Sequence, residues 1–235
     1  RIKIMIGIIG AMETEVKSLL SSMKDAKEIQ IGNLTFYSGR LIGKDVVIVK
    51  CGVGKVNASV CASTLIREFE PDAIINTGIA GAMAAGLRMF DFVVSSEAIY
   101  HDVDIQVFGY KLGQIPGAPV SFKADEKLIS AVEMAFVENS ELSERKLVKG
   151  RVATGDQFIS TKEKKDFIKT NFLPACTEME GAAIAHTCTN FGIPFVIVRC
   201  MSDMADESAE QTYQFNEDTA AEQCAKLIKS VLGEI

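Results

Sequence analysis

The chain of 235 residues has few of the residues that build metal sites or disulfide frameworks. It contains two histidines and six scattered cysteines, none of them in a Cys-x-x-Cys pair. A zinc site would need unusual ligands, and only His186-Thr187-Cys188 keeps such a site open as an alternative. We therefore expect no metal and no cofactor. Several cysteines lie inside apolar runs, which predicts reduced core residues of a cytoplasmic protein.

Prolines, an excess of positive charge and long apolar runs are also lacking. Five prolines, 48% hydrophobic and 24% charged residues are typical of a globular protein. The formal net charge of −6 argues against nucleic acid or an anionic membrane as partner, because both carry negative charge. The longest nearly apolar run, residues 4–12, is too short to span a bilayer, which needs about 20 residues. Small molecules and other proteins remain.

Apolar runs alternate with helix-period segments along the chain. Buried strands are predicted at Ile4–Ile9, Val46–Val49, Ala73–Ile75, Phe92–Val94 and Phe195–Val198. Helices are predicted at Met12–Met23, Val56–Phe69, Lys127–Val137, Lys162–Thr170, Met179–Phe191 and Ala220–Leu232. Leu34–Arg40 and Asp45–Lys50 add an antiparallel hairpin. With no linker and no repeat, this order predicts one α/β domain over residues 1–235 with a mixed, largely parallel twisted sheet.

Glycine-rich segments follow several predicted strands, where ligands bind in parallel sheets. Gly52-Val53-Gly54-Lys55 lacks the spacing and the Ser/Thr of a nucleotide phosphate loop. Gly7-Ile8-Ile9-Gly10 does not match the dinucleotide fingerprint either. These mismatches exclude ATPase and NAD-dependent functions, and the glycines are expected to let the backbone approach a small ligand closely.

Two acids, Glu178 and Glu180, bracket Met179 at a predicted helix start. On a helix they would point to nearly opposite sides, so only one can face a pocket. A helix start favours an ionised carboxylate, which accepts hydrogen bonds and would suit a sugar diol. The alternative, that both acids only stabilise the helix start, stays open.

Glu15 lies on or beside the apolar stripe of the first predicted helix, whereas Glu13 is placed to pair with Lys17 on the wet face. A carboxylate on an apolar face should have a raised pKa, which suits a general acid or base. The alternative is a residue at the edge of the stripe that reaches water.

Asp203 follows the apolar segment that begins at Phe195, so it should project into the ligand crevice. Alternatively, Ser202 or Asp203 caps the next helix. Arg199, inside that strand, needs a buried partner or an anion. Phe158 could stack on a flat heterocycle or pack in the core. Acids at three strand ends, one of them suited to a diol, favour cleavage of a glycosidic bond.

The segment 101–123 is long, irregular and rich in aromatic residues. A loop of this length in a compact domain is usually functional or disordered, and the aromatics favour a binding wall or a subunit interface. His101-Asp102-Val103-Asp104 could form a metal cluster, but alternating acids in an open loop are more often solvated or capping.

Five motifs together resemble bacterial 5'-methylthioadenosine/S-adenosylhomocysteine nucleosidases, with a likeness from about Ile4 to Phe215. They are Gly7–Val16, Asn76–Gly81, Thr154–Ile159, Glu178–Ala182 and Ser202–Asp206. The Glu-Met-Glu and Ser-Asp elements are shared with nucleoside phosphorylases, whereas the Gly-Ala-Met-Glu-x-Glu start is more specific to the nucleosidases. The resemblance implies a three-layer α/β/α fold of the nucleoside phosphorylase type.

The resemblance also implies roles for individual residues. Asp203 would donate a proton or hydrogen bond to adenine N7, and Glu15 would activate the attacking water. The substrate-binding residues would be Glu180 at the ribose hydroxyls, Met179 on the sugar, Phe158 stacked on the purine, the Ile159 backbone at the purine edge and Gly81 at the purine end, with Glu178 and Ser202 beside them. Ile79 stands where some relatives carry serine, which leaves the water's second hydrogen bond to Arg199.

In this family a neighbouring subunit completes the pocket for the 5'-thio substituent, so a homodimer is expected. The neighbour's residues would be Ile105, Phe108, Tyr110 and Pro116, facing Met12, Val53 and Tyr213. The implied activity is hydrolysis of methylthioadenosine and S-adenosylhomocysteine to adenine and a thioribose product, in methionine salvage and the methyl cycle. A purine nucleoside phosphorylase and a non-catalytic nucleoside-binding protein remain as alternatives.

Overall fold

The computed structural model describes residues 4–235, and its strands form one mixed sheet. The strands are β1 (Met5–Gly10), β2 (Lys24–Ile31), β3 (Leu34–Leu41), β4 (Lys44–Lys50), β5 (Ala73–Ala82), β6 (Phe92–Tyr100), β7 (Phe122–Lys123), β8 (Leu147–Thr154), β9 (Cys176–Glu178) and β10 (Phe195–Asp203). The helices are α1 (Glu13–Leu20), α2 (Lys55–Phe69), α3 (Glu126–Glu138), α4 (Lys162–Phe172), α5 (Gly181–Phe191) and α6 (Ala209–Glu234), with 3-10 turns at Gln106–Phe108 and Ser140–Leu142.

The sheet is open at one end and closed on itself at the other. β1 pairs in parallel with β4 and β5, and the hairpins β4–β3 and β3–β2 extend the sheet to its exposed edge. β10 pairs with both β5 and β6, while β8 and β9 connect β6 back to β5, so these five strands form a closed circuit. This circuit brings the carboxyl ends of β5, β9 and β10 together beside the end of β1.

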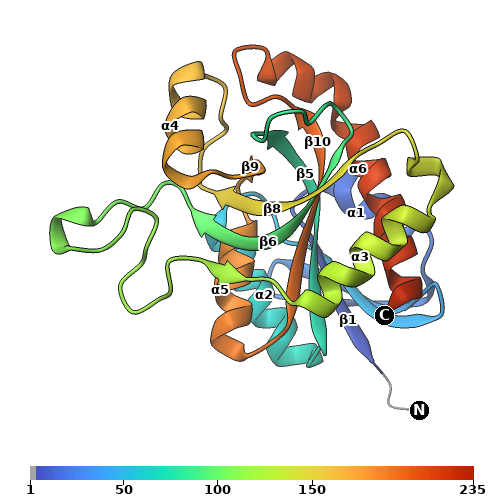
Figure 1. The fold of residues 1–235 in the computed structure, drawn as a ribbon. Coiled ribbons are helices and arrows are strands. Elements are labelled where there is room, and N and C mark those ends of the chain that lie inside the picture. The colour runs from blue at the N-terminus through green and yellow to red at the C-terminus, as the bar shows by residue number, and fades with distance from the viewer. Residues whose placement is uncertain (1–3) are drawn as a thin grey trace.

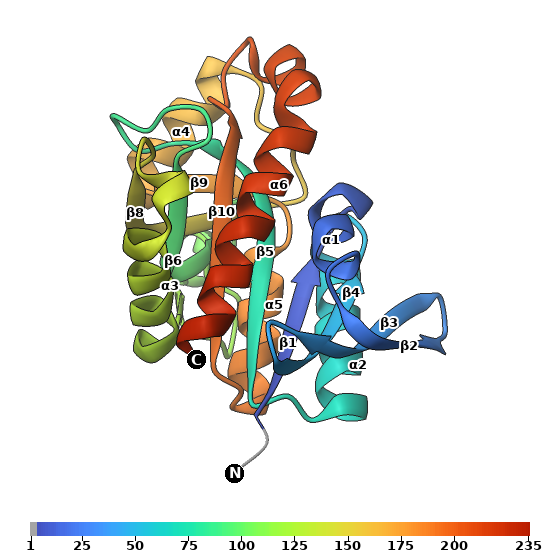
Figure 2. The ribbon, with the colours of Figure 1, turned by 90° about the vertical axis from the view of Figure 1, so that its right-hand side faces the viewer.

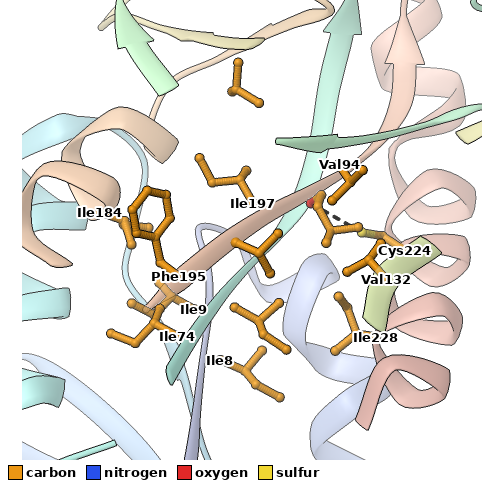
Figure 3. Packing of buried hydrophobic residues seen from close by; sticks show 14 of the residues in the cluster. Ile8, Ile9, Ile74, Val94, Val132, Ile184, Phe195, Ile197, Cys224 and Ile228 are labelled. Carbon is orange, nitrogen blue, oxygen red and sulfur yellow. Dashed lines mark hydrogen bonds between the residues drawn. The ribbon is translucent and has the colours of Figure 1, made fainter. Parts of the chain in front are cut away.

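Helices cover both faces of the sheet, as the predicted three-layer architecture requires. α6 packs on β10 and β5 and contacts α1 and α3 on its own side, while α2 and α5 pack together on the other side (Figures 1 and 2). Between the layers lies a dry core to which β1, β5 and β10 contribute Ile8, Ile74 and Ile197, and α6 contributes Cys224 and Ile228 (Figure 3). All ten residues of β5 are buried, which agrees with a strand covered on both faces.

Several predicted elements need correction. The first helix ends at Leu20 instead of Met23, and β2 follows at once. β2 was not predicted because its residues are nearly all exposed and mostly charged or polar, so it lacks an apolar run. α6 begins at Ala209, well before the predicted Ala220. The prediction missed its first turns because they are mostly polar and show no clear apolar period. Glu13 pairs with Lys50 at 3.2 Å rather than with Lys17.

The segment between β6 and β7 is an irregular loop, as predicted, and it extends away from the body of the molecule (Figure 1, green). In the part of the chain that the structure describes, no helix is long and apolar enough to cross a membrane.

Candidate active site

A pocket at the carboxyl ends of the strands collects most of the predicted site residues. Those that line it are Met12, Glu15, Val53, Ile79, Gly81, Phe158, Glu178, Met179, Glu180, Ser202, Asp203 and Tyr213. Ile159 lies in a smaller adjoining cavity that shares Gly81, Phe158 and Asp203 with the main one. Arg199, Ile105, Phe108 and Pro116 do not line either cavity of this chain.

Glu15 is held at the floor of the pocket by backbone amides of two elements. Its Oε2 accepts hydrogen bonds from the N–H groups of Ala11 (2.6 Å) and Met12 (3.1 Å), and its Oε1 accepts one from Ile79 (3.0 Å). The residue is only 4% exposed, so it does not reach out to water from the helix edge. Burial raises the pKa of Glu15, while Arg199 and the three amides act in the opposite direction.

Asp203 ends β10 and is 3% exposed. Its Oδ1 accepts a hydrogen bond from the Ala205 N–H (2.8 Å) and its Oδ2 one from the Ser202 hydroxyl (2.9 Å). Burial raises the pKa of Asp203 more than these two donors lower it. A carboxyl group with a raised pKa is suited to donate a proton to a leaving group.

Glu178 lines the pocket and accepts hydrogen bonds from the elements around it. Its Oε2 accepts hydrogen bonds from the backbone N–H groups of Glu180 (3.1 Å) and Gly181 (2.7 Å), at the start of α5, and from Arg199 Nη2 (2.5 Å). The Thr154 hydroxyl donates to its Oε1. Glu178 itself belongs to β9 and α5 begins at Gly181, two residues later than predicted.

Glu180 precedes α5 and faces the pocket, where its Oε1 accepts a hydrogen bond from the Gly54 N–H (2.8 Å). Burial, together with the nearby Glu178 carboxylate, raises the pKa of Glu180 to about 8. This raised pKa runs against the expectation that an acid at this helix start stays ionised, because the desolvation of Glu180 outweighs its single amide donor.

Arg199 is buried behind the pocket. Its Nη1 donates to the carbonyls of Asn76 and Val198, and its Nη2 donates to the Asn76 side chain (2.6 Å) and to Glu178. Glu178 is thus the buried partner that the sequence demanded. The Arg199 Nε has no hydrogen-bond partner among the described residues, so a hydrogen bond from Arg199 to a water stays a prediction.

The open end of the pocket is apolar and partly aromatic. The rings of Phe158 and Tyr213 meet edge to face with centroids 5.5 Å apart, and the Tyr213 hydroxyl donates to Met12 Sδ (3.2 Å). Phe158 is 43% exposed, which does not suit a core-packing role and leaves one face for a flat ligand.

Sequence reasoning missed several residues of the site. Ala11, Ala80 and Thr177 also line the pocket, and Asn76, Gly54 and Thr154 hold its acids and arginine in place. Small or singly polar residues carry no chemical signal of their own. The only indication for most of these residues was that they lie in or beside the motifs. For Gly54 it was the glycine-rich segment 52–55.

The acids of the His101–Asp104 segment serve as partners within the fold, which is the alternative to a metal cluster. Asp102 pairs with Lys55 at 2.6 Å, and Asp104 accepts the Gln106 N–H at 3.1 Å. Within residues 4–235, no group of three or more His, Cys, Asp or Glu side chains could hold a metal ion.

The chain is similar to known proteins of one superfamily. A profile of the Phosphorylase superfamily matches residues 5–233. The 5'-methylthioadenosine/S-adenosylhomocysteine nucleosidase of Geobacillus sp. (strain WCH70) is 41% identical over 231 residues, which are 98% of this chain and 98% of that protein. The chain therefore belongs to the 5'-methylthioadenosine/S-adenosylhomocysteine nucleosidase family of this superfamily.

Solved structures of the same family agree with the fold. The nucleosidase of Colwellia psychrerythraea, in complex with adenine, has a TM-score of 0.95 and 41% identity, covering 99% of this chain and 96% of its own. The nucleosidase of Neisseria meningitidis, in complex with methylthio-immucillin-A, has a TM-score of 0.95 and 38% identity, covering 98% and 99%.

Proposed function

We propose that this protein hydrolyses the N-glycosidic bond of 5'-methylthioadenosine and S-adenosylhomocysteine, releasing adenine and the thioribose product. The observation that carries the proposal is the placement of two buried carboxyl groups with raised pKa values, Glu15 and Asp203, on the walls of one pocket. Hydrolysis of a glycosidic bond needs one acid for the leaving group and one base for water. The names of the relatives support the same substrates.

The two carboxyl groups differ in a way that assigns their tasks. Glu15 accepts three backbone N–H bonds, which stabilise its ionised form, so it acts as the base that takes a proton from water. Asp203 accepts one amide and one hydroxyl, and burial keeps its pKa raised, so it acts as the acid that protonates purine N7. The leaving group is then neutral adenine, and the sugar passes through an oxocarbenium-like state.

Glu180 binds the ribose hydroxyls between these two groups, with Met179 against the sugar. A diol would replace part of the lost hydration of the Glu180 carboxyl with hydrogen bonds. Phe158 stacks on the purine, and the Ile159 backbone reads its edge from the adjoining cavity. These assignments follow the motif positions, and they are supported by the main cavity, which Glu180, Met179 and Phe158 line, and by the adjoining one, which Ile159 lines.

A phosphorylase on the same fold would need a site for a phosphate dianion. Such sites are built from Arg, Lys and backbone N–H groups. Within residues 4–235, no lysine or arginine lines the pocket, whereas four acids do: Glu15, Glu178, Glu180 and Asp203. A dianion beside the ionised carboxylate of Glu15 would be repelled, which favours water as the nucleophile.

We further propose that the protein works as a homodimer in the cytoplasm. Val107 and Phe108 in the irregular loop, and Val56 and Val60 on α2, are exposed apolar residues that a second copy would cover. The loop would then supply Ile105, Phe108, Tyr110 and Pro116 to the neighbour's pocket. All six cysteines are unpaired and buried, which supports a reducing compartment.

The proposal is tested by incubating the purified protein with methylthioadenosine or with S-adenosylhomocysteine and measuring adenine over time. Catalytic release of adenine from both nucleosides is the expected result. Tight binding of either nucleoside without adenine release over hours would contradict it and would support the non-catalytic alternative.

A further inference from the structure

Asp203 depends on a backbone conformation that its own segment does not favour. The N–H of Ala205 reaches Asp203 Oδ1 while Ala205 has φ +50°, in the left-handed region that residues with a side chain rarely adopt. The strained residue is completely buried. A conformation of this kind persists only where neighbouring elements hold it, so something outside the segment Met204–Ser208 must do so.

α4 is one of the elements that contact this segment. Ile168 and Phe172 of α4 share a small buried cluster with Ala205 and Ile159. Lys165 lies three residues before Ile168, on the same face of the helix. Its Nζ donates a hydrogen bond to the carbonyl oxygen of Met204, the residue between Asp203 and Ala205. Figure 2 shows α4 beside the loop that joins β10 to α6.

The charge of Lys165 also acts on the two acids that flank its hydrogen-bond acceptor. The pKa of Asp206 is lowered mainly by the hydrogen bond from the Ser208 hydroxyl, and Lys165 lowers it further. Lys165 lowers the pKa of Asp203 as well, against the larger effect of burial and the repulsion from Asp206. From α6, the Tyr213 hydroxyl is the other titratable group that interacts with Asp203.

We propose that Lys165 is a positioning residue for Asp203: it holds the Met204–Ser208 segment so that the Ala205 amide stays on the catalytic carboxyl group. The inference rests on the proposed nucleosidase activity. Neither Lys165 nor Met204 lines the substrate pocket, so the effect of Lys165 reaches the substrate only through Asp203. It should therefore appear in kcat more than in KM.

The test compares Lys165→Met with Lys162→Met, a lysine on the same helix whose hydrogen-bond and ion-pair partner is Asp166 at the surface. We expect Lys165→Met to lower kcat by about tenfold, the size of one lost charge-assisted hydrogen bond, with KM within about twofold. We also expect the basic limb of the kcat profile against pH to move to higher pH, because Asp203 loses a nearby cation and keeps its proton longer. Lys162→Met should change neither.

Two further variants separate positioning from simple loss of structure. Lys165→Arg keeps the charge and a donor, and should restore kcat to within about twofold. Lys165→Gln keeps a donor without the charge, and should move the basic limb even if Lys165→Met does not fold. Melting temperatures show whether each variant is folded at the assay temperature.

The inference is overturned if Lys165→Met behaves like Lys162→Met, or if kcat falls with no shift of the basic limb and no rescue by arginine. If Lys165→Met does not fold, an unmoved limb in Lys165→Gln overturns it. These outcomes are distinct from a failure of the proposed function, in which the unsubstituted protein would release no adenine at all.

Discussion

Glu15 and Asp203 are both buried carboxyl groups, yet their surroundings differ in the number of donors that face them. Three backbone amides face Glu15, and one amide with one hydroxyl faces Asp203. Amide donors favour the ionised form, so the protein can keep a base and an acid a short distance apart at one pH.

Substitution of either group should remove activity while the fold persists. We expect Glu15→Gln and Asp203→Asn each to lower kcat/KM by about 10²–10⁴, the usual worth of a placed proton transfer. Glu13→Gln is the matched control, since Glu13 is an exposed acid two residues away whose partner is Lys50 at 3.2 Å. Wild-type turnover in Asp203→Asn would show that the leaving-group acid is another residue.

The raised pKa of Glu180 predicts a pH-dependent stability. Its pKa is about 8 in the folded protein against an ordinary value of 4.5. Between these values the folded state holds a proton that the unfolded state has lost, so stability falls as pH rises from 4.5 to 8. Glu180→Gln should therefore melt above the unsubstituted protein at pH 8, with a gap that shrinks toward pH 5. A gap independent of pH would contradict the ionisation argument.

Among single residues, the sequence was most informative where a charged residue interrupts an apolar pattern. Glu15 on an apolar stripe and Arg199 inside an apolar strand could be singled out because a lone buried charge is costly. Thr177 and Gly54 could not, since a small residue in a loop or short strand has no such cost.

Among the elements, β5 and α1 come close together where Gly78 faces Glu15. A Cβ at Gly78 of β5 would lie 2.4 Å from Glu15 Oε1. The carboxylate would have to leave its three amide donors to make room. The glycine therefore belongs to the catalytic geometry as much as to the strand.

Gly78→Ala should accordingly lower kcat/KM in a protein that still folds. We expect a loss of about 10²-fold in kcat/KM, with a destabilisation of about 1–3 kcal/mol from overpacking. Gly233→Ala, in α6 with no atom within 4 Å of the added Cβ, is the control and should leave activity unchanged. Equal activity of the two variants would show that Glu15 tolerates displacement.

Elements could be predicted where burial produces a regular pattern of apolar residues in the sequence. β1, β4 and β5 were found as apolar runs, and the β3–β4 hairpin was found from its alternation. β2 and the first turns of α6 escaped because they are exposed and polar. The closed circuit through β5, β10 and β6 depends on pairings between distant segments, which no local pattern reports.

The whole molecule presents an exposed apolar loop. Phe108 is 77% exposed, and it lies in the loop assigned to the neighbouring subunit's pocket. An exposed aromatic of this kind is costly unless a partner covers it.

We expect the protein to sediment at twice its chain mass of 25.5 kDa. Phe108→Ala should raise KM for methylthioadenosine by about tenfold, as loss of an aromatic anchor does, with kcat less affected. Phe215→Ala is the control, because Phe215 is 87% exposed on α6 and outside the pocket lining. A fully active monomer at micromolar concentration would contradict the shared site.

The most direct measurement is adenine release from methylthioadenosine by the purified, dialysed protein in phosphate-free buffer, with a parallel reaction in phosphate. A pocket that the described part of the chain lines with four acids and with no lysine or arginine predicts the same rate in both reactions and free methylthioribose as the sugar product. Strict dependence on phosphate, with a sugar 1-phosphate as product, would contradict hydrolysis by water.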